Sequence, residues 1–568
     1  MANMNQAMTD LLRYNAGIGS IQRSRFDKSH SHTTTFDSGA LVPLMVDRVL
    51  PGDEKKIQYS GLARMATPIH PVMDQAFFDV SAFYVPDRLW YAHAKEFYGE
   101  NKDAEFNPDG EYVLPYLTPQ RYAVRDDDNS QTGYGSLNDY FGFPVMSDSV
   151  AAARSEDPDF YVSAGLHRCY QLIWNEYYRN SSIQPSLRLN DGDTVTQEEW
   201  EEISQLRYVN KYPDYFTTLL KEPQSGPDVL LPLGDYAPII PRNENVVEDA
   251  SGTIPVVRFM EDDGTYIDSA FGNRILGTVD GTQTLFDYDV NSTQLSSPLT
   301  AIPRNLWADL TNQTNATINN LRAAITAQHL FELQNRAGKR YQQILYATWS
   351  VLTPDATLQR PLMLGTSRTE VGMRQVLQTS EGTENSPLGN TGAFSLTSVN
   401  NEWICNQAFT EPGIIMVLGA VRPVVSYSQG LNVLWAQLTP FEQYQPVFDD
   451  IGDQPVYNYE IYSGDNATVE QLKGVLGYKP AWQEYRIMQN RVSGKMRPDV
   501  TGTLSSWNYS LNFVETPELD GNFIAVNPSF MERAISVQSE PQFICDSYFK
   551  YIDIKSMSVY SIPGVDKI

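Results

Sequence analysis

The sequence predicts a mainly β protein: a β-sandwich that carries long insertions and a few helices. Aromatic residues make up 12% of the chain, with 33 tyrosines, and aromatic side chains favour strands. The 34 prolines favour turns and long loops over a helical bundle. A chain of 568 residues with 41% hydrophobic residues can bury a sizeable core without disulfides or metals.

Four segments have the patterns of strands. Residues 76–85 (AFFDVSAFYV) alternate between apolar and polar positions around Asp79 and Ser81, which is typical of a half-buried strand. Residues 414–421 (IIMVLGAV) are apolar throughout, which predicts a strand buried on both faces. Two more strands are predicted at 543–554 and 557–562. The run 414–421 is far shorter than the roughly 20 residues of a membrane helix, so we expect no membrane association.

Two helices are predicted. Residues 316–336 have a helical apolar period, with Asn315 as N-cap and Gly338 as the stop. His329 lies on the apolar stripe of this helix, so we interpret it as a core histidine and not as a catalytic base. A second, shorter helix is predicted over 166–178.

Composition divides the chain into an arm, a body and an insertion. Residues 1–40 are polar and irregular, which predicts an extended arm that orders only against a partner. The body would then cover 41–568, with 225–305 as an insertion. Within the insertion, residues 243–300 hold ten acidic side chains against two arginines, as expected of an exterior loop. The acidic residues assigned to this exterior surface include Glu261, Asp262, Asp263 and Asp280.

The sequence predicts no catalytic residue, no metal and no cofactor. It lacks a P-loop, a dinucleotide-binding glycine motif and a zinc-protease motif. Two histidines, His30 and His32, are too few for a metal site. Residues 126–130 (DDDNS) resemble the start of a calcium loop but lack its later glycine and glutamate, so a solvated acidic turn is the preferred interpretation.

The three cysteines, Cys169, Cys405 and Cys545, are far apart. They predict no disulfide framework and fit a reducing cytoplasm, although one bridge between two of them stays open. The first 15 residues contain no apolar run of secretory type. We therefore expect synthesis in a cytoplasm.

Basic residues are concentrated at two loci, although the net charge is −27 and such an acidic chain is no general nucleic-acid binder. Both loci interleave cations with aromatic residues, a pattern that suits single-stranded nucleic acid. Ion pairs between subunits are an equally open interpretation. The candidate contacts are Arg23, Arg25 and Lys28 beside Phe26, and Arg486, Arg491, Lys495 and Arg497 beside Trp482 and Tyr485. Three tryptophans, Trp435, Trp482 and Trp507, could line a sugar site, but core packing is the default for such residues.

Long segments, in order along the chain, resemble the major capsid protein of the small single-stranded DNA bacteriophages, the microviruses, and their gokushovirus-like branch. The segments include RSRFDKSHSHTTTFDSGALVPLMVDRVLPGD (23–53), TPIHPVMDQAFFDVSAFYVPDRLWY (67–91), YPDYFTTLLKEPQSGPDVLLPLG (212–234), ATINNLRAAITAQHLFELQNRAGKRYQQIL (316–345), LTPFEQYQPVFDDIGDQPVYNYEIY (438–462) and GYKPAWQEYRIMQNRVSGKMR (477–497). The resemblance covers roughly half the chain and spans nearly all of it.

The resemblance implies an eight-stranded antiparallel jelly roll with very long loops, assembled into the simplest icosahedral shell around circular single-stranded DNA. It implies that the 225–305 insertion projects outward. It also implies assembly in the host bacterial cytoplasm and localisation in the virion. The implied partners are further copies of the chain, the DNA genome, a small basic DNA-binding protein and other virion proteins, and a host receptor is allowed.

Two other functions remain as alternatives. The first is a phage receptor-binding or lectin-like β-sandwich that does not build the shell. The second is a carbohydrate-active enzyme, for which no pair of acidic residues can be singled out among the 69 present.

Overall fold

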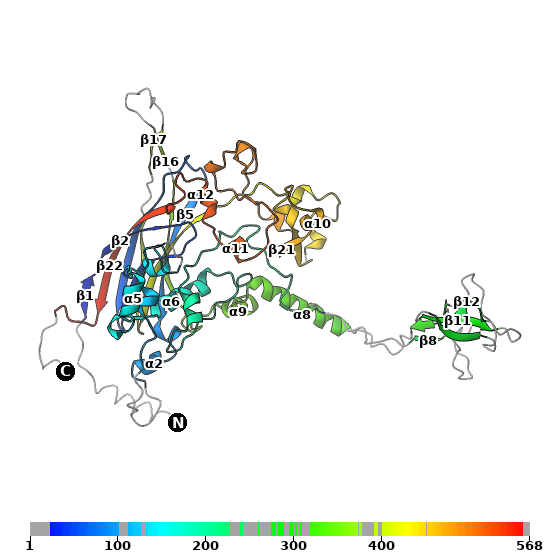
Figure 1. Cartoon of the computed structure of the whole chain (residues 1–568), viewed down its shortest axis with the longest axis horizontal. Helices are drawn as coiled ribbons and strands as arrows, with labels where there is room; N and C mark the ends of the chain where they lie inside the picture. Colours follow the sequence, from blue (N-terminus) through cyan, green and yellow to red (C-terminus); the bar gives the residue numbers. More distant parts are fainter. Residues whose placement is uncertain are drawn as a thin grey trace. The chain divides into compact units, whose positions relative to one another are not determined.

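Figure 1 shows the computed structural model of the chain. It describes residues 23–100, 112–127, 131–227, 229, 318–372, 400–449 and 451–560, and the strands that lie between 239 and 308 and between 374 and 395. The chain divides into two compact units, one formed by 1–225 and 332–568 and the other by 226–331. The predicted acidic exterior residues Glu261, Asp262, Asp263 and Asp280 lie outside the described residues.

The first unit contains two antiparallel sheets. The five-stranded sheet has the order β1-β22-β4-β18, with β2 also paired to β22, and the four-stranded sheet has the order β15-β5-β19-β3. The strands of the first sheet are β1 (Ser24–Asp27), β2 (His30–Phe36), β4 (Glu54–Met65), β18 (Asn400–Ala408) and β22 (Phe543–Lys555), and those of the second are β3 (Val42–Val49), β5 (Ala76–Pro86), β15 (Leu362–Glu370) and β19 (Gly413–Pro423).

The two sheets pack face to face around one apolar core. Phe549 and Tyr551 of β22 lie in this core together with Phe78 of β5 and Val417 of β19. Helix α6 (Gly165–Ile173) packs on the other face of the four-stranded sheet, where Met416 of β19 is buried. The mainly β sandwich predicted from the sequence is therefore confirmed at the level of packed antiparallel sheets.

Most predicted strands are confirmed. The apolar run 414–421 is part of β19, and its side chains are buried on both faces. Strand β5 begins half-buried as predicted, but from Ser81 onward both of its faces are buried because α6 and its neighbours cover the outer one. The predicted strand over 557–562 is wrong for residues 557–560, which form bends after β22 ends.

The helices are short and lie mainly in the connections. They are α2 (Ala94–Phe97), α3 (Pro119–Tyr122), α4 (Leu137–Tyr140), α5 (Asp148–Arg154), α6, α7 (Gln197–Ile203), α8 (Ile318–Ala337), α9 (Tyr341–Trp349), α10 (Val469–Leu472), α11 (Gly521–Ile524) and α12 (Ser529–Glu532). The predicted helix over 316–336 is confirmed as α8, and that over 166–178 as α6 with a π-helical turn, η3 (Trp174–Tyr178). His329 is exposed, so its interpretation as a core histidine is wrong; Asn335 is the buried residue of α8 in the part of the chain that the structure describes.

Part of the predicted arm belongs to the sandwich. Strands β1 and β2 pair with β22 along Ser24–Asp27 and His30–Phe36, and Figure 1 shows all three side by side. The prediction that residues 1–40 order only against a partner is therefore wrong for 24–36. Polar alternation in HSHTTTF concealed this strand, because one of its faces is solvated and Phe36 is its one buried side chain.

The second unit contains small antiparallel pairings. Strand β11 lies between β10 and β12, β8 pairs with β14, and β9 pairs with β13. The strands are β8 (Ile239–Pro241), β9 (Phe259–Met260), β10 (Arg274–Val279), β11 (Thr282–Tyr288), β12 (Leu295–Leu299), β13 (Ile302–Pro303) and β14 (Leu306–Ala308). The first unit has further two-stranded pairings, formed by β6 (Tyr116–Leu117) with β7 (Val162–Ser163), β16 (Arg374–Leu377) with β17 (Thr391–Ser395), and β20 (Asp453–Tyr457) with β21 (Val475–Pro480).

A buried cluster of charges joins both ends of the described chain. The Lys55 Nζ, on β4, lies 2.9 Å from an Asp47 carboxylate oxygen and 3.1 Å from one of Asp553, and it donates to the Tyr551 hydroxyl at 2.7 Å. Lys55 and Asp553 are fully buried, so each depends on opposite charges within the cluster for compensation. This lysine–aspartate cluster consists of Lys28, Lys55 and Lys555 with Asp47, Asp53 and Asp553.

Acid should weaken the lysine–aspartate cluster. Burial alone would raise the pKa of Asp47, but hydrogen bonds from Lys28, Tyr551 and Lys55 outweigh it and lower the pKa from 3.8 to about 2. The stabilisation is then complete above pH 4 or so and is lost as the pH falls through about 2. In urea unfolding, the stability difference between the wild-type chain and Asp47→Asn should shrink by about 2 kcal/mol between about pH 5 and pH 2. A difference that does not change with pH would contradict this account.

Candidate functional site

Two irregular segments form a groove that collects part of the second predicted basic locus. The groove has a volume of about 490 Å³, and both Arg491 and Arg497 line it. Backbone hydrogen bonds fix its walls, because the Tyr427 N–H donates to the Asn490 carbonyl at 2.9 Å and the Val492 N–H donates to the Tyr427 carbonyl at 3.2 Å. Cations therefore sit on a fixed frame beside the sandwich.

The four cations of this locus differ in their pairing. Arg497 makes two hydrogen bonds to Asp499, at 3.2 and 3.0 Å, and the Arg486 guanidinium lies 3.5 Å from Asp449. The side chains of Arg491 and Lys495 are exposed and make no hydrogen bond or ion pair with any residue that the structure describes. Arg491 is thus the groove cation with the most freedom to take an external anion.

The aromatic partner in the groove is a residue that sequence reasoning had assigned to the core. Trp435, in the turn η5 (Val433–Trp435), is 77% exposed and lines the groove. Trp482 is buried, and its indole N–H donates to the Phe448 carbonyl at 2.9 Å, so the predicted pairing of Trp482 with the basic locus is wrong. Trp507 is partly buried and stacks on His70, with ring centroids 4.9 Å apart.

The N-terminal basic locus is mostly used within the chain. Lys28 belongs to the lysine–aspartate cluster, with its Nζ 2.6 Å from Asp47. The Arg23 guanidinium donates to the Gly52 carbonyl. Arg25, on β1, is exposed and has no hydrogen-bond or ion-pair partner among the described residues. Of this locus, Arg25 alone keeps the free cation that the prediction required.

A buried polar network includes Glu460, which lines the groove. The Tyr215 hydroxyl donates to Glu460 at 2.8 Å, and the Lys479 Nζ lies 2.8 Å from Glu484. Burial raises the pKa of Glu460, although Lys479 and the bond from Tyr215 act in the opposite direction. All four side chains are buried and pair with one another, so the network fixes the groove rather than presenting an acid or base to a ligand.

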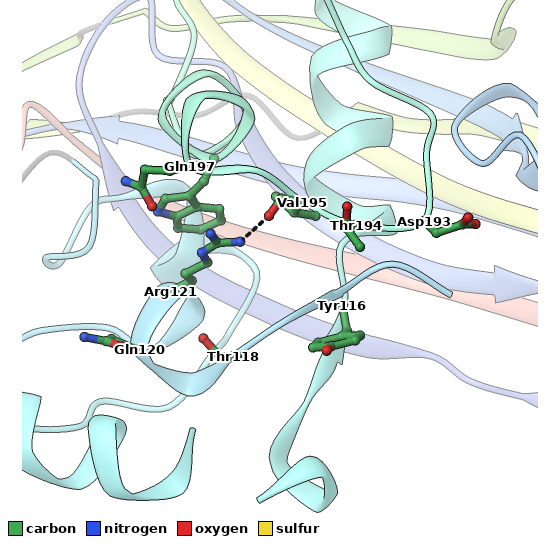
Figure 2. Close-up of a pocket in the computed structure, with 9 residues that line it drawn as sticks. Tyr116, Thr118, Gln120, Arg121, Asp193, Thr194, Val195 and Gln197 are labelled. Atoms are coloured by element: carbon green, nitrogen blue, oxygen red, sulfur yellow. Dashed lines mark hydrogen bonds between the residues drawn. The ribbon is translucent and has the colours of Figure 1, made fainter. Parts of the chain in front are cut away.

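Another cavity, with a polar lining, lies elsewhere in the first unit. Its volume is about 590 Å³, and Figure 2 shows Arg121 reaching across it to donate to the Val195 carbonyl at 2.8 Å. Asp193 on its wall accepts a hydrogen bond from His93 at 2.9 Å, and this bond lowers the pKa of Asp193.

The described residues contain no cluster of three or more His, Cys, Asp or Glu side chains that could hold a metal ion. Cys169, Cys405 and Cys545 are all free and buried. None of the helices described is long and apolar enough to cross a membrane.

Comparison with known proteins gives matches along nearly the whole chain. The family model described as capsid protein (F protein) matches residues 17–565. Capsid protein VP1 of Chlamydia phage 1 is 33% identical, over 96% of this chain and 96% of its own length. Capsid protein VP1 of Spiroplasma virus 4 is 31% identical over 100% and 99%, and that of Bdellovibrio phage phiMH2K is 30% identical over 95% and 95%. These matches confirm the resemblance to microvirus capsid proteins. The chain therefore belongs to the phage capsid protein (F protein) family and is a structural protein of the virion.

Proposed function

We propose that this capsid protein is an eight-stranded jelly roll that tiles a small icosahedral shell around circular single-stranded DNA. The order of the strands supports the jelly roll. Eight strands alternate between the two sheets along the chain, except that β5 and β15 are consecutive in the same sheet, and this alternation is what two Greek keys in one sandwich require. The eight strands are β2, β3, β4, β5, β15, β18, β19 and β22.

The main support for the shell-forming role is the match to capsid proteins over nearly the full length of the chain. A closed shell needs several different contacts per subunit, each closed by symmetry. Long irregular connections such as 424–452 can supply these contacts without disturbing the sandwich. The same role extends the proposal to the 225–305 insertion, which we place on the outer surface because of its acidic composition.

Electron microscopy of the purified, expressed chain tests the shell directly. The proposal expects closed particles of one size. Free trimers or spikes would favour the receptor-binding or lectin-like alternative. A monomer that hydrolyses a glycoside through one carboxylate would favour the enzyme.

For DNA we propose the groove at Arg491 and Arg497 as a contact. Its chemistry suits single-stranded DNA, because guanidinium groups pair with phosphates and the exposed Trp435 offers a face on which a base can stack. With a net charge of −27, the chain cannot neutralise a genome by itself. A separate small basic protein would provide most of the positive charge, and other virion proteins and a host receptor complete the proposed partners.

Removing the groove cations should lower the DNA content while leaving the shells intact. We expect particles of Arg491→Gln/Arg497→Gln to hold less DNA than wild-type particles, measured by their absorbance ratio at 260 and 280 nm. Binding of the subunit to a single-stranded oligonucleotide should lose about 0.7 of its salt slope per arginine removed, and Trp435→Ala should weaken it by about 1–3 kcal/mol.

Arg154→Gln is the matched control, because Arg154 is exposed on α5 and does not line the groove. This variant should package DNA as the wild-type chain does. Full DNA content and an unchanged salt slope in the double groove variant would refute the groove as a DNA contact without affecting the shell.

A further inference from the structure

Helix α9 has an apolar face that the described part of the chain does not cover. Its sequence, YQQILYATW, places Tyr341, Leu345 and Trp349 at intervals of four residues, on one face. Tyr341 is 67% exposed and Trp349 is 64% exposed, and no residue of α9 is buried against the described part of the chain. Tyr346, Val351 and Leu352 continue the exposed apolar surface. Figure 1 shows α9 as a short helix directly after α8.

Hydrogen bonds at both ends attach α9 firmly to neighbouring segments of the chain, although its apolar face is exposed. The Arg340 guanidinium, at the N-cap of α9, donates to the carbonyls of Asn175 and Arg179, both at 2.8 Å. The Gln342 side chain donates to the Thr353 carbonyl at 3.2 Å beyond the far end of the helix. The chain therefore fixes α9 on the body and presents its apolar face outward.

A second apolar surface surrounds an acidic cavity in the same unit. The cavity has a volume of about 430 Å³, and Phe441, Tyr457 and Trp482 contribute to its apolar wall. Leu438, Phe441 and Val447, from the connection that borders it, are 85%, 78% and 86% exposed. The charged residues that line the cavity are three glutamates and one lysine: Glu442, Glu460, Glu484 and Lys479.

Hydrogen bonds also hold this second surface in place. Glu442 accepts from the N–H groups of Leu438 and Thr439 at 2.7 and 2.9 Å. The Tyr485 hydroxyl donates to Gln437 at 2.6 Å. The exposed apolar side chains named for the two surfaces range from Val351 at 55% to Val447 at 86% exposed, and in a standard interface each partner buries roughly 800 Å².

We propose that the α9 face of one copy of this chain docks on the acidic cavity and its apolar rim on a neighbouring copy. The proposal rests on the shell-forming role and names one of its contacts. Charge complementarity supports the pairing and its direction. Lys339, just before α9, is exposed and has no ion pair with a described residue, and the N-terminal end of a helix is positive. Lys339 can pair with Glu442 at the cavity, whereas Glu460 and Glu484 stay paired with Tyr215 and Lys479 of their own chain.

The occupant is a second copy and not DNA, because the glutamates of the cavity would repel phosphate groups. The contact joins two different surfaces, so each copy uses its α9 face on one neighbour and its cavity on another. Such a heterologous contact extends from copy to copy and closes when the rotation allows it, as a shell requires.

Two charge insertions test the two sides of the contact. We expect Tyr341→Asp and Phe441→Asp each to abolish particle formation, measured by sedimentation and electron microscopy, while the far-UV spectrum and urea midpoint of the subunit stay at wild-type values because both side chains are exposed. Val145→Asp is the matched control: Val145 is 65% exposed and belongs to neither surface, so this variant should assemble. Normal particles from either of the first two variants would overturn the proposal.

A cysteine pair tests the direction of the contact in intact particles. The native cysteines are buried, so a short bis-maleimide should react only at introduced sites. Particles of Lys339→Cys/Gln443→Cys should give covalent dimers and longer ladders, whereas particles of either single variant should give none. Cross-linking in a single variant, or no ladder from the double variant, would overturn the pairing. Particles from the wild-type chain in the same experiment show that such a failure belongs to this contact and not to shell formation.

Discussion

We expect Lys55→Met to lower the free energy of unfolding of the subunit by about 3–5 kcal/mol, because it removes the fully buried cation and leaves three aspartates with two lysines, Lys28 and Lys555. The Lys55 Nζ lies within 3.7 Å of carboxylate oxygens from Asp47, Asp53 and Asp553. The Asp53 and Asp553 side chains are at most 1% exposed, so water cannot replace the lost cation. The measurement is urea unfolding of the unassembled subunit, followed by tryptophan fluorescence.

Lys56→Met is a control one residue away. Lys56 points to the other face of β4, where its side chain is 35% exposed and its Nζ pairs with Glu54 at 2.9 Å. Exposed pairs of this kind contribute at most about 1 kcal/mol. Equal losses in the two variants would show that burial of the cluster is not what makes Lys55 important. Adding Asp553→Asn to Lys55→Met should recover part of the loss, since it removes an uncompensated charge.

We expect a loss of similar size, about 3–5 kcal/mol, from Arg168→Met. Arg168 is buried on α6, the helix that covers the four-stranded sheet, and its Nε donates to Glu199 at 2.8 Å. Its Nη1 also donates to the Gly192 carbonyl at 2.8 Å. Methionine fills a similar volume but leaves the buried Glu199 carboxylate and the partly buried Gly192 carbonyl without the arginine that donates to them. An unpaired buried acceptor costs its full desolvation penalty.

Arg154→Met separates this effect from the general loss of an arginine. Arg154 is exposed on α5 and packs on Phe160 with 5.5 Å between the guanidinium carbon and the ring centroid. Its replacement should change the unfolding free energy by less than about 1 kcal/mol. Glu199→Gln in the Arg168→Met background should regain stability, and a further loss there would contradict the buried-charge explanation.

Local sequence patterns predicted several strands of the two sheets. They did not predict that the N-terminal segment adds β1 and β2 to the five-stranded sheet. The apolar run of β19 and the alternation of β22 are visible in a single window of sequence, because buried faces impose a period on neighbouring residues. Strand β2 could not be recognised this way, since Ser31, Thr33 and Thr35 are exposed on its outer face and its partner is more than 500 residues distant. Its pairing depends on tertiary contact, which local propensity does not contain.

The candidate site was predicted in part for the same reason. The sequence placed Arg491 and Arg497 in one basic segment, and they do meet in one groove. It could not separate the buried Trp482 from the exposed Trp435, because both lie in irregular segments without a period. The sequence also could not predict the ion pair between Lys28 and Asp47. The number of charges along a chain does not show which residues meet across two sheets.

The position of β22 also has a consequence for synthesis. This strand, close to the end of the described chain, inserts between β4 and the pair β1 and β2. A nascent chain that ends before β22 therefore has a gap in its larger sheet and lacks Asp553 and Lys555 of the lysine–aspartate cluster. The sandwich can close only after β22 has been synthesised, and the long sequence separation makes this closing step slow. Chains that terminate before β22 lack the strand that joins β4 to β1 and β2.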